Sequence, residues 1–288
     1  MRVAVTGVGL LTPAGTERAD VRARVSRGES CLSAADQLGS PVPVVGRVEG
    51  PRLRGLLTRR KDAKLFSRAA KLLLPPMIDA LGAWEGDREE LGLFVGVRRE
   101  PADGGEADAA LAACAVDGRF STEALAGRGR ALYPPLLPLK TLPNLNLAHV
   151  AIQLGIRGAS GTCAGGPAAG VAALVQGLEA VAEGDCPAAL VGASDSSVRD
   201  AFLRDWARRG MTDVPGEGGV AFLLEPPHAP GALAHLERVR GPAPASGPPP
   251  HRAVLGHLGC ADLLLHLLLH AESVGDGPHV RVVPQGAW

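Results

Sequence analysis

The chain has 288 residues, and its 30 lysine and arginine residues balance 30 aspartate and glutamate residues, which gives a formal net charge of zero. This balance argues against nucleic acid as the main partner, and the length is sufficient for a large core in one domain or in two linked halves. Apolar residues make up 46% of the chain but aromatic residues only 3%. We therefore expect alanine, valine, leucine and glycine to build a core of closely packed helices and sheets.

The cysteines and the apolar segments indicate a cytoplasmic protein. The five cysteines are scattered along the chain and form no C-x-x-C pair, which is typical of reduced thiols and predicts no metal site. The first residues run into a strand-like segment without a signal-peptide pattern. The longest apolar helical segment, residues 258–271, is interrupted by Asp262, His266 and His270, so we expect no membrane span.

Strand-like and helix-like segments alternate along the first part of the chain. Buried strands are predicted at residues 3–6, 42–48 and 91–97. Helices are predicted at residues 17–27, 62–84 and 144–154. Gly7-Val8-Gly9 is expected to close the first strand, and Pro75-Pro76 is expected to split or kink the second helix. Residues 101–130 are polar and small, and they are predicted to form an excursion with short helices.

The alternation continues to the C-terminus. Further strands are predicted at residues 159–163, 187–193, 218–225, 232–239 and 279–283. Further helices are predicted at residues 168–183, 198–209 and 258–271. Residues 240–250 are rich in proline and predict a stiff linker without secondary structure. Strands that alternate with helices predict an α/β fold with a mostly parallel sheet.

Pro167 occupies the most informative position in the sequence. A small-residue strand leads into Gly165-Gly166, Pro167 follows, and an alanine-rich helix then runs to Gly184. Many acyl-transfer enzymes expose a serine or cysteine at such a strand-to-helix turn. Proline has neither a nucleophilic group nor a backbone N–H that could stabilise an oxyanion, although it is a favoured residue for starting a helix. The pattern indicates a catalytic scaffold without its catalytic group.

Four segments of the chain resemble the β-ketoacyl synthase family, which has the thiolase fold. They are VAVTGVGLLTPAG at residues 3–15, LGLFVGV at 91–97, LPNLNLAHVAIQLGIRGAS at 142–160 and VPGEGGVAFLLE at 214–225. The resemblance implies a thiolase-like layered α/β fold. Its first half, residues 1–225, would be complete, and its second half, residues 226–288, would be strongly reduced and would contain the linker.

The resemblance places the nucleophilic cysteine of the family at Pro167, and the spacing to Gly184 supports this register. Active members of the family decarboxylate malonyl-carrier protein and condense it with a cysteine-bound acyl chain. The related chain-length factors of type II polyketide systems also lack the cysteine, although they usually carry glutamine in its place. The family is one of acyltransferases, but the resemblance implies that this protein is inactive on its own. Whether it is an enzyme therefore stays open.

The two catalytic histidines of the family belong to the reduced half. The first motif, Asn-Ala-His-Gly, has no counterpart in this sequence, and neither has the glycine-rich loop with its gating phenylalanine. The second motif resembles residues 252–261, where His257 matches the histidine and Arg252 the usual lysine, with one residue missing before Gly259. The resemblance thus implies no catalytic residue at Pro167, with Cys163, His257 and Arg252 as remnants.

Several of these groups also have ordinary structural interpretations. Cys163 could act as an alternative nucleophile, but a small buried thiol is the common case. His257 could assist catalysis, or it could precede the last helix and bind a backbone group. His266 and His270 have the i, i+4 spacing that could suit a metal, yet no carboxylate or cysteine joins them at convincing spacing.

Three other features are interpreted as structural. Gly7-Val8-Gly9 lacks the rest of the G-x-G-x-x-G dinucleotide pattern, so no cofactor is predicted. Glu217 is expected in a turn between core layers. Ser194, Asp195 and Ser196 follow a strand, where α/β folds gather function, but without a neighbouring base we interpret them as solvated loop residues.

The leading hypothesis is a non-catalytic ketosynthase-like subunit of fatty-acid or polyketide synthesis. It would pair with an active ketosynthase through residues 142–160, or form a homodimer, supply one wall of an acyl tunnel, and meet an acyl carrier protein indirectly. Two alternatives stay open: a divergent acyltransferase that uses Cys163 with His257, and an acyl-binding relic without a partner. The sequence does not identify the chain length, the carrier protein or the product.

Overall fold

The computed structural model describes residues 1–35, 42–50, 53–82, 84–98, 107–238, 251–271 and 279–282. Its centre is a seven-stranded mixed sheet with the strand order β11-β10-β1-β9-β8-β4-β7. The strands are β1 (Arg2–Leu11), β4 (Gly92–Val97), β7 (Ser160–Ala164), β8 (Ala189–Ser196), β9 (Glu217–Glu225), β10 (Ala234–Arg238) and β11 (His279–Val282). β7, β4 and β8 run parallel, whereas β9 is antiparallel to both β8 and β1. The sheet is therefore mixed, and the prediction of a mostly parallel sheet is wrong. β7 is an edge strand of the described sheet.

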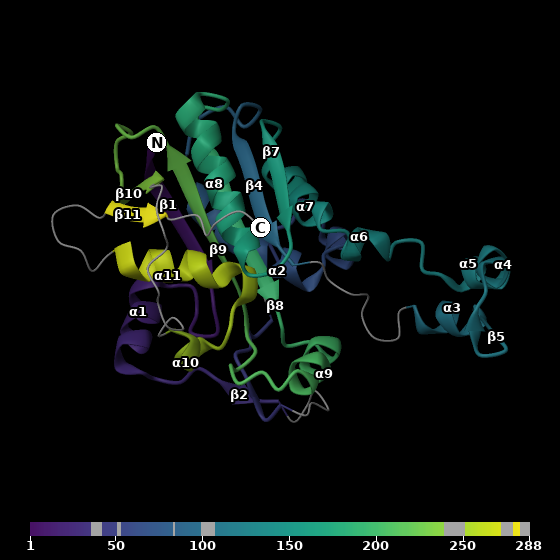
Figure 1. Ribbon diagram of the computed structural model, residues 1–288. Helices are drawn as coiled ribbons and strands as arrows, with labels where there is room; N and C mark the ends of the chain where they lie inside the picture. The colour runs from purple at the N-terminus through teal and green to yellow at the C-terminus, as the bar shows by residue number, and fades with distance from the viewer. Residues whose placement is uncertain are drawn as a thin grey trace.

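Helices cover both faces of this sheet (Figure 1). α2 (Arg68–Leu81) and α7 (Asn144–Leu154) lie on one face, and α8 (Ala168–Glu183) and α11 (Asp262–Ala271) lie on the other. The strands supply alternate side chains to the two cores: Leu190 and Leu223 pack with α2, whereas Val191 and Leu224 pack with α8. This alternation is what a sheet that is buried on both faces requires.

Shorter elements complete the described chain. They are α1 (Arg18–Arg27), α9 (Asp200–Arg208), α10 (His251–Leu255), and the 3-10 helices η2 (Arg60–Lys64) and η4 (Gly259–Ala261). A small ladder joins β2 (Ser33–Ala34) to β3 (Val44–Val45). A separate excursion contains α3 (Asp108–Ala113), β5 (Ala115–Val116), β6 (Arg119–Phe120), α4 (Thr122–Ala124), the π-helix η3 (Leu125–Gly129), α5 (Arg130–Leu132) and α6 (Pro138–Thr141). None of the described helices combines the length and apolar character needed to cross a bilayer.

The prediction that Gly7-Val8-Gly9 closes the first strand is wrong, because β1 continues through it to Leu11. The glycines serve helix packing instead. A Cβ atom on Gly7 would lie 1.8 Å from the Ala80 carbonyl oxygen, and one on Gly9 would lie 2.0 Å from that of Pro76. The backbone of α2 can therefore press directly onto β1, and these glycines form no phosphate-binding loop.

Pro75-Pro76 was expected to split or kink its helix, and the split is wrong. α2 runs without interruption from Arg68 to Leu81 with both prolines inside it. The Ser67 hydroxyl accepts a hydrogen bond from the Ala70 N–H at 2.9 Å and so caps the helix. Nine of the fourteen residues of α2 are buried, and this packing outweighs the hydrogen bonds that the prolines remove.

Other boundaries differ for local reasons. Of residues 42–48 only Val44–Val45 form a strand, because the Val48 N–H bonds the Glu217 carboxylate rather than a neighbouring strand. The helix predicted at residues 258–271 divides into η4 and α11. The proline-rich linker predicted at residues 240–250 lies outside the described residues. The boundary after residue 225 stays a prediction, although β10 joins the same sheet beside β1.

Candidate functional site

The strand-turn-helix geometry predicted around Pro167 is present. β7 ends at Ala164, the Gly165 N–H donates to the Val97 carbonyl at 3.1 Å, and α8 begins at Ala168. Pro167 is the residue before the helix, with φ −56° and ψ −26°, and its ring is exposed. The N-terminus of a sixteen-residue helix is a favourable place for negative charge, yet the group displayed there is a pyrrolidine.

Cys260 lies against this turn, a contact that the sequence pattern does not indicate. Its thiol donates to the Gly166 carbonyl at 3.3 Å, and its own carbonyl packs so closely on α8 that a Cβ on Gly170 would lie 2.1 Å from it. Burial, with the Asp195 carboxylate beside it, raises the pKa of the Cys260 thiol far above its ordinary value. The thiol beside the turn is therefore protonated and weakly nucleophilic.

Asp195 connects the end of β8 to η4. Its carboxylate accepts from Arg98 Nε at 3.0 Å, from the Cys260 N–H at 3.1 Å and from the Ser196 N–H at 2.8 Å. Burial raises the pKa of this carboxyl, and the Arg98 guanidinium opposes that shift. The interpretation of Ser194, Asp195 and Ser196 as solvated loop residues is wrong, because all three are buried within β8.

Glu217 is a second buried carboxylate, at the start of β9. It accepts from Arg68 Nε at 2.9 Å, from the Ser196 hydroxyl at 2.7 Å and from the Val48 N–H at 3.0 Å. Both carboxylate oxygens are engaged, and the side chain has no exposed surface. These contacts join the segment after β3 to α2, β8 and β9, as a structural role requires. The expectation of a turn is wrong, because Glu217 is the first residue of strand β9.

His257 binds the backbone around it. Its ring Nδ1 accepts a hydrogen bond from the Gly259 N–H at 2.9 Å, and its backbone N–H donates to the Val214 carbonyl at 2.7 Å. The imidazole meets the Trp206 ring edge-on, with 5.8 Å between the ring centroids. Burial lowers the pKa of this imidazole, so the neutral form is favoured. The geometry fits the interpretation of His257 as a residue that precedes the last helix and binds a backbone group.

Arg252 is held by two carboxylates. Its Nε donates to Asp262 at 2.6 Å and its terminal nitrogen to Asp213 at 3.1 Å. Asp262 also bonds His251 Nε2 at 2.9 Å and the Leu258 N–H at 3.2 Å. Burial opposes ionisation of Asp262, but the hydrogen bond from His251 and the neighbouring positive charges lower its pKa. Asp262 thus ties α10 and η4 to α11, a role that the sequence showed only as a polar break in an apolar segment.

Cys163 lies on the edge strand β7, half-buried, with its thiol 3.4 Å from Gln176 Oε1 on α8. Burial raises the pKa of this thiol, which disfavours the thiolate. Its hydrogen bond to Gln176, and those of His257 to the backbone, do not join the two residues into a nucleophile–base pair. The structure nevertheless brings the two segments that resemble family motifs together, because η4, just after His257, packs on the turn before Pro167.

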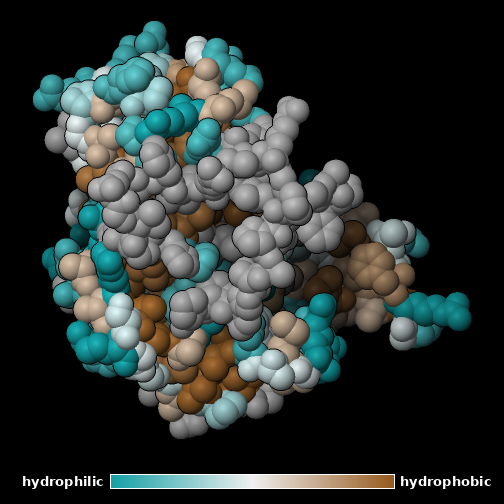
Figure 2. Space-filling model, turned by 60° about the vertical axis from the view of Figure 1, so that its left-hand side comes forward, coloured by the Kyte–Doolittle hydropathy of each residue, from teal (hydrophilic) through white to brown (hydrophobic). Residues whose placement is uncertain are grey.

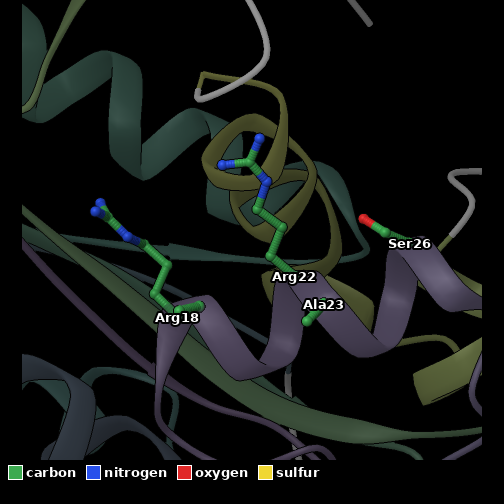
Figure 3. Close-up of a pocket in the computed structure, with 5 residues that line it drawn as sticks. Arg18, Arg22, Ala23 and Ser26 are labelled. Atoms are coloured by element: carbon green, nitrogen blue, oxygen red, sulfur yellow. The ribbon is translucent and has the colours of Figure 1, made fainter.

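No group of three or more metal-ligating side chains occurs within the described residues. A hollow of about 440 Å³ lies along α1, where Arg18, Ala19, Arg22, Ala23 and Ser26 line it (Figure 3). All of these residues belong to α1. The hollow contains none of the residues of the turn at Pro167.

The profile of the family "Beta-ketoacyl synthase, N-terminal domain" matches residues 1–217, about three quarters of the chain. The search of curated proteins found no sequence that matches this chain. Among solved structures, "The ishigamide ketosynthase/chain length factor" is similar, with a TM-score of 0.67 and 20% identity, and the match covers 96% of this chain and 93% of that chain. The two chains are therefore of nearly equal length.

Two longer structures are also similar. One is a type II polyketide synthase acyl-carrier protein in complex with its ketosynthase bound to the hexaketide, with a TM-score of 0.58 and 18% identity over 78% of this chain and 62% of that one. The other is a β-ketoacyl synthase from Burkholderia phymatum STM815, with a TM-score of 0.58 and 16% identity over 78% of this chain and 59% of that one. This chain thus corresponds to about three fifths of their length. The family profile and the shared layers confirm the predicted thiolase-like fold, and the chain belongs to the β-ketoacyl synthase family.

Proposed function

We propose that the protein is a non-catalytic ketosynthase-like subunit of polyketide or fatty-acid synthesis. In this proposal it pairs with an active ketosynthase and forms one wall of the tunnel that holds the growing acyl chain. The observation that carries the proposal is Pro167 at the start of α8, where the family resemblance puts the nucleophilic cysteine. Condensation needs an acyl-accepting thiol at this point, and proline cannot accept an acyl group.

The neighbouring groups support the loss of catalysis. The thiols of Cys260 and Cys163 have raised pKa values, so neither is an activated nucleophile. His257 already accepts a backbone hydrogen bond at Nδ1. Without nucleophile, base or a second histidine motif, a ketosynthase fold retains its shape and its surfaces rather than its chemistry.

The comparisons favour a paired subunit over a solitary relic. The similar structure of nearly equal length is named as a ketosynthase/chain length factor, and another is a ketosynthase in complex with an acyl-carrier protein. By analogy, the partner of this chain is a full-length ketosynthase, with a homodimer as the alternative assembly. The carrier protein would then meet the assembly chiefly through the catalytic subunit.

The contact that we propose runs along residues 142–160 and the edge strand β7. One side of β7 pairs with β4, and its other side borders no strand of the described sheet. Such an edge offers backbone groups for pairing with another chain. Ile152 on α7 adds a large apolar side chain that is 67% exposed.

Two measurements test the proposal. The purified protein is incubated with acyl-loaded carrier protein and its intact mass is determined; we expect no acyl adduct. It is also co-expressed with an active type II ketosynthase, and light scattering is expected to give the mass of a pair. A stoichiometric adduct on Cys163 would instead support an acyltransferase, and a monomer in both samples that binds acyl chains would support a relic.

A further inference from the structure

Helix α1 presents a row of polar side chains to the hollow of about 440 Å³ that lies along it. Arg18, Arg22 and Ser26 line the hollow and recur at intervals of four residues, so they lie one after another on the same side of the helix. In Figure 3 both arginine side chains project from this side of α1, and the Ser26 hydroxyl lies further along it. One wall of the hollow therefore carries a row of hydrogen-bond donors.

Small side chains leave space between these donors. Ala19 and Ala23 are the other two described residues that line the hollow, and each follows one of the arginines directly. A methyl group is all that each of them adds to the wall. The volume of the hollow lies within the range of about 300–1,000 Å³ that is typical of sites for small molecules. The hollow is therefore large enough for a small ligand to reach both guanidinium groups.

Packing and a terminal cap hold α1 in place. Val21 is fully buried in the main hydrophobic core, and Val25 packs against that core. Gly28 ends the helix with a φ of 63°, and its N–H donates to the Val25 carbonyl at 3.1 Å. The Glu29 N–H donates to the Arg24 carbonyl at 2.9 Å and completes the cap. The row of donors is therefore displayed by a fixed element, as a binding site requires.

The charge of α1 favours an anionic ligand. The helix contains four arginines and a single acidic residue, Asp20. Asp20 is two residues away from both Arg18 and Arg22, and residues at this separation point to different sides of a helix. The wall that α1 gives to the hollow therefore contains two guanidinium groups and no carboxylate. Such a wall attracts negative charge.

The chemistry of the donors narrows the class of anion. A guanidinium group is a planar fork of N–H donors that matches the oxygens of a phosphate group in a bidentate contact. The Cβ atoms of two residues one helical turn apart lie about 5–6 Å from each other, and two long arginine side chains can close this distance onto one diphosphate group. A serine hydroxyl adds a further donor to a phosphate oxygen. A diphosphate group supplies enough charge and enough acceptors for all three side chains at once.

We propose that the hollow along α1 binds a small molecule that carries a diphosphate group, held by the guanidinium groups of Arg18 and Arg22 and by the Ser26 hydroxyl. The inference goes beyond the proposed function and does not depend on it. Neither the turn at Pro167 nor residues 142–160 line the hollow. The group recognised is the diphosphate itself, which a free diphosphate or a nucleoside diphosphate would supply.

The test compares two double variants that remove the same charge from the same helix. Arg18→Gln with Arg22→Gln changes the hollow, whereas Arg24→Gln with Arg27→Gln changes two arginines that face Glu29 at 3.6 Å and 2.8 Å. Binding of inorganic pyrophosphate is measured by titration calorimetry at low ionic strength, and circular dichroism checks folding. We expect the wild type to bind pyrophosphate at one saturable site. The hollow variant should bind at least about tenfold more weakly, and the control within about threefold.

A protection experiment locates the ligand, and a second probe identifies its source. Pyrophosphate is expected to slow the modification of Arg18 and Arg22 by phenylglyoxal, followed by peptide mass spectrometry, and to leave Arg27 unprotected. Tighter binding of ADP than of pyrophosphate would support a nucleoside diphosphate, and the reverse order would support a free diphosphate. Equal weakening by the two double variants, or no saturable binding of either probe, would overturn the proposal. Binding of succinate as tight as that of pyrophosphate would also overturn it, in favour of a site for any dianion.

Discussion

The body of the molecule and the excursion at residues 107–142, which we call the arm, are built in opposite ways. In the body, polar groups are buried and bonded: Asp195, Glu217 and Asp262 each accept at least three hydrogen bonds. Along the arm, which recedes on the right of Figure 2, small residues are buried and large apolar ones are exposed. The first region is complete without a partner, whereas the second keeps apolar area in water. The comparison separates a body whose buried polar groups are paired within the chain from a surface whose large apolar side chains are not covered by the described chain.

The strongest test of this contrast is removal of a buried carboxylate. Glu217→Ala leaves Arg68 without its partner and removes the group that bonds Val48 and Ser196. We expect a loss of about 3–5 kcal/mol in the free energy of unfolding, measured with urea. The control is Glu89→Ala, which removes an exposed pair with Arg157 and should cost less than about 1 kcal/mol. Similar losses for both variants would show that the buried network is not what stabilises the body.

A second test compares a core residue of α7 with a residue of the proposed pairing surface on the same helix. Val150 and Ile152 are two residues apart on α7, yet Val150 is fully buried whereas Ile152 is 67% exposed. The sequence pattern does not distinguish the two positions, but only Ile152 can carry a charge without loss of the core. Ile152→Glu should weaken pairing at least about tenfold while stability changes by less than about 0.5 kcal/mol. Val150→Glu should unfold the protein, as circular dichroism would report.

A smaller effect is expected from pH, through His149 at the base of the arm. Burial lowers the pKa of His149 below its ordinary value of 6.5, so the unfolded chain binds a proton more readily than the folded one. Stability from this histidine is therefore present above the ordinary value and is lost as the pH falls below it. His257 has a lowered pKa for the same reason and contributes with the same sign.

Thermal unfolding of the wild-type protein and of His149→Gln, measured between about pH 7 and pH 5, isolates this effect. The variant should lose less stability on acidification than the wild type. His228→Gln, at an exposed position, provides the control and should follow the wild type. An unchanged pH dependence in His149→Gln would mean that this imidazole is not held neutral by burial.

Much of the fold could be predicted from local patterns. Residues 144–154 and 168–183 form helices with the predicted bounds, because glycine with positive φ ends each of them at Gly155 and Gly184. Features set by tertiary packing could not be predicted. Gly7 and Gly9 allow α2 to approach β1 in space, and the sequence pattern cannot distinguish this from a turn.

The surroundings of the candidate site were less predictable than its position. The turn at Pro167 follows from its glycines and the helix after it. Cys260, by contrast, comes close to it only because Asp195 accepts the Cys260 N–H, and these residues are 65 positions apart in the chain. Asp195 itself follows an apolar strand as a loop residue would, and only the folded chain buries it. The exposure of the arm is equally invisible in a sequence whose apolar residues resemble those of a core.

The smallest effect is expected on condensation activity, from a substitution at Pro167. Pro167→Cys restores a thiol and a backbone N–H at the exposed N-terminus of α8, which favours the thiolate. We expect iodoacetamide to alkylate this thiol faster than Cys163 or Cys260, yet we expect no condensation of acyl- with malonyl-carrier protein. His257 is bound to the backbone, the other histidine motif is missing, and each absent acid–base group typically costs about 10²–10⁴-fold in rate. Pro167→Ala, which restores the N–H alone, is the matched control. Turnover by Pro167→Cys near that of an active ketosynthase would mean that the loss of one thiol, rather than of the whole catalytic set, separates this chain from its catalytic relatives.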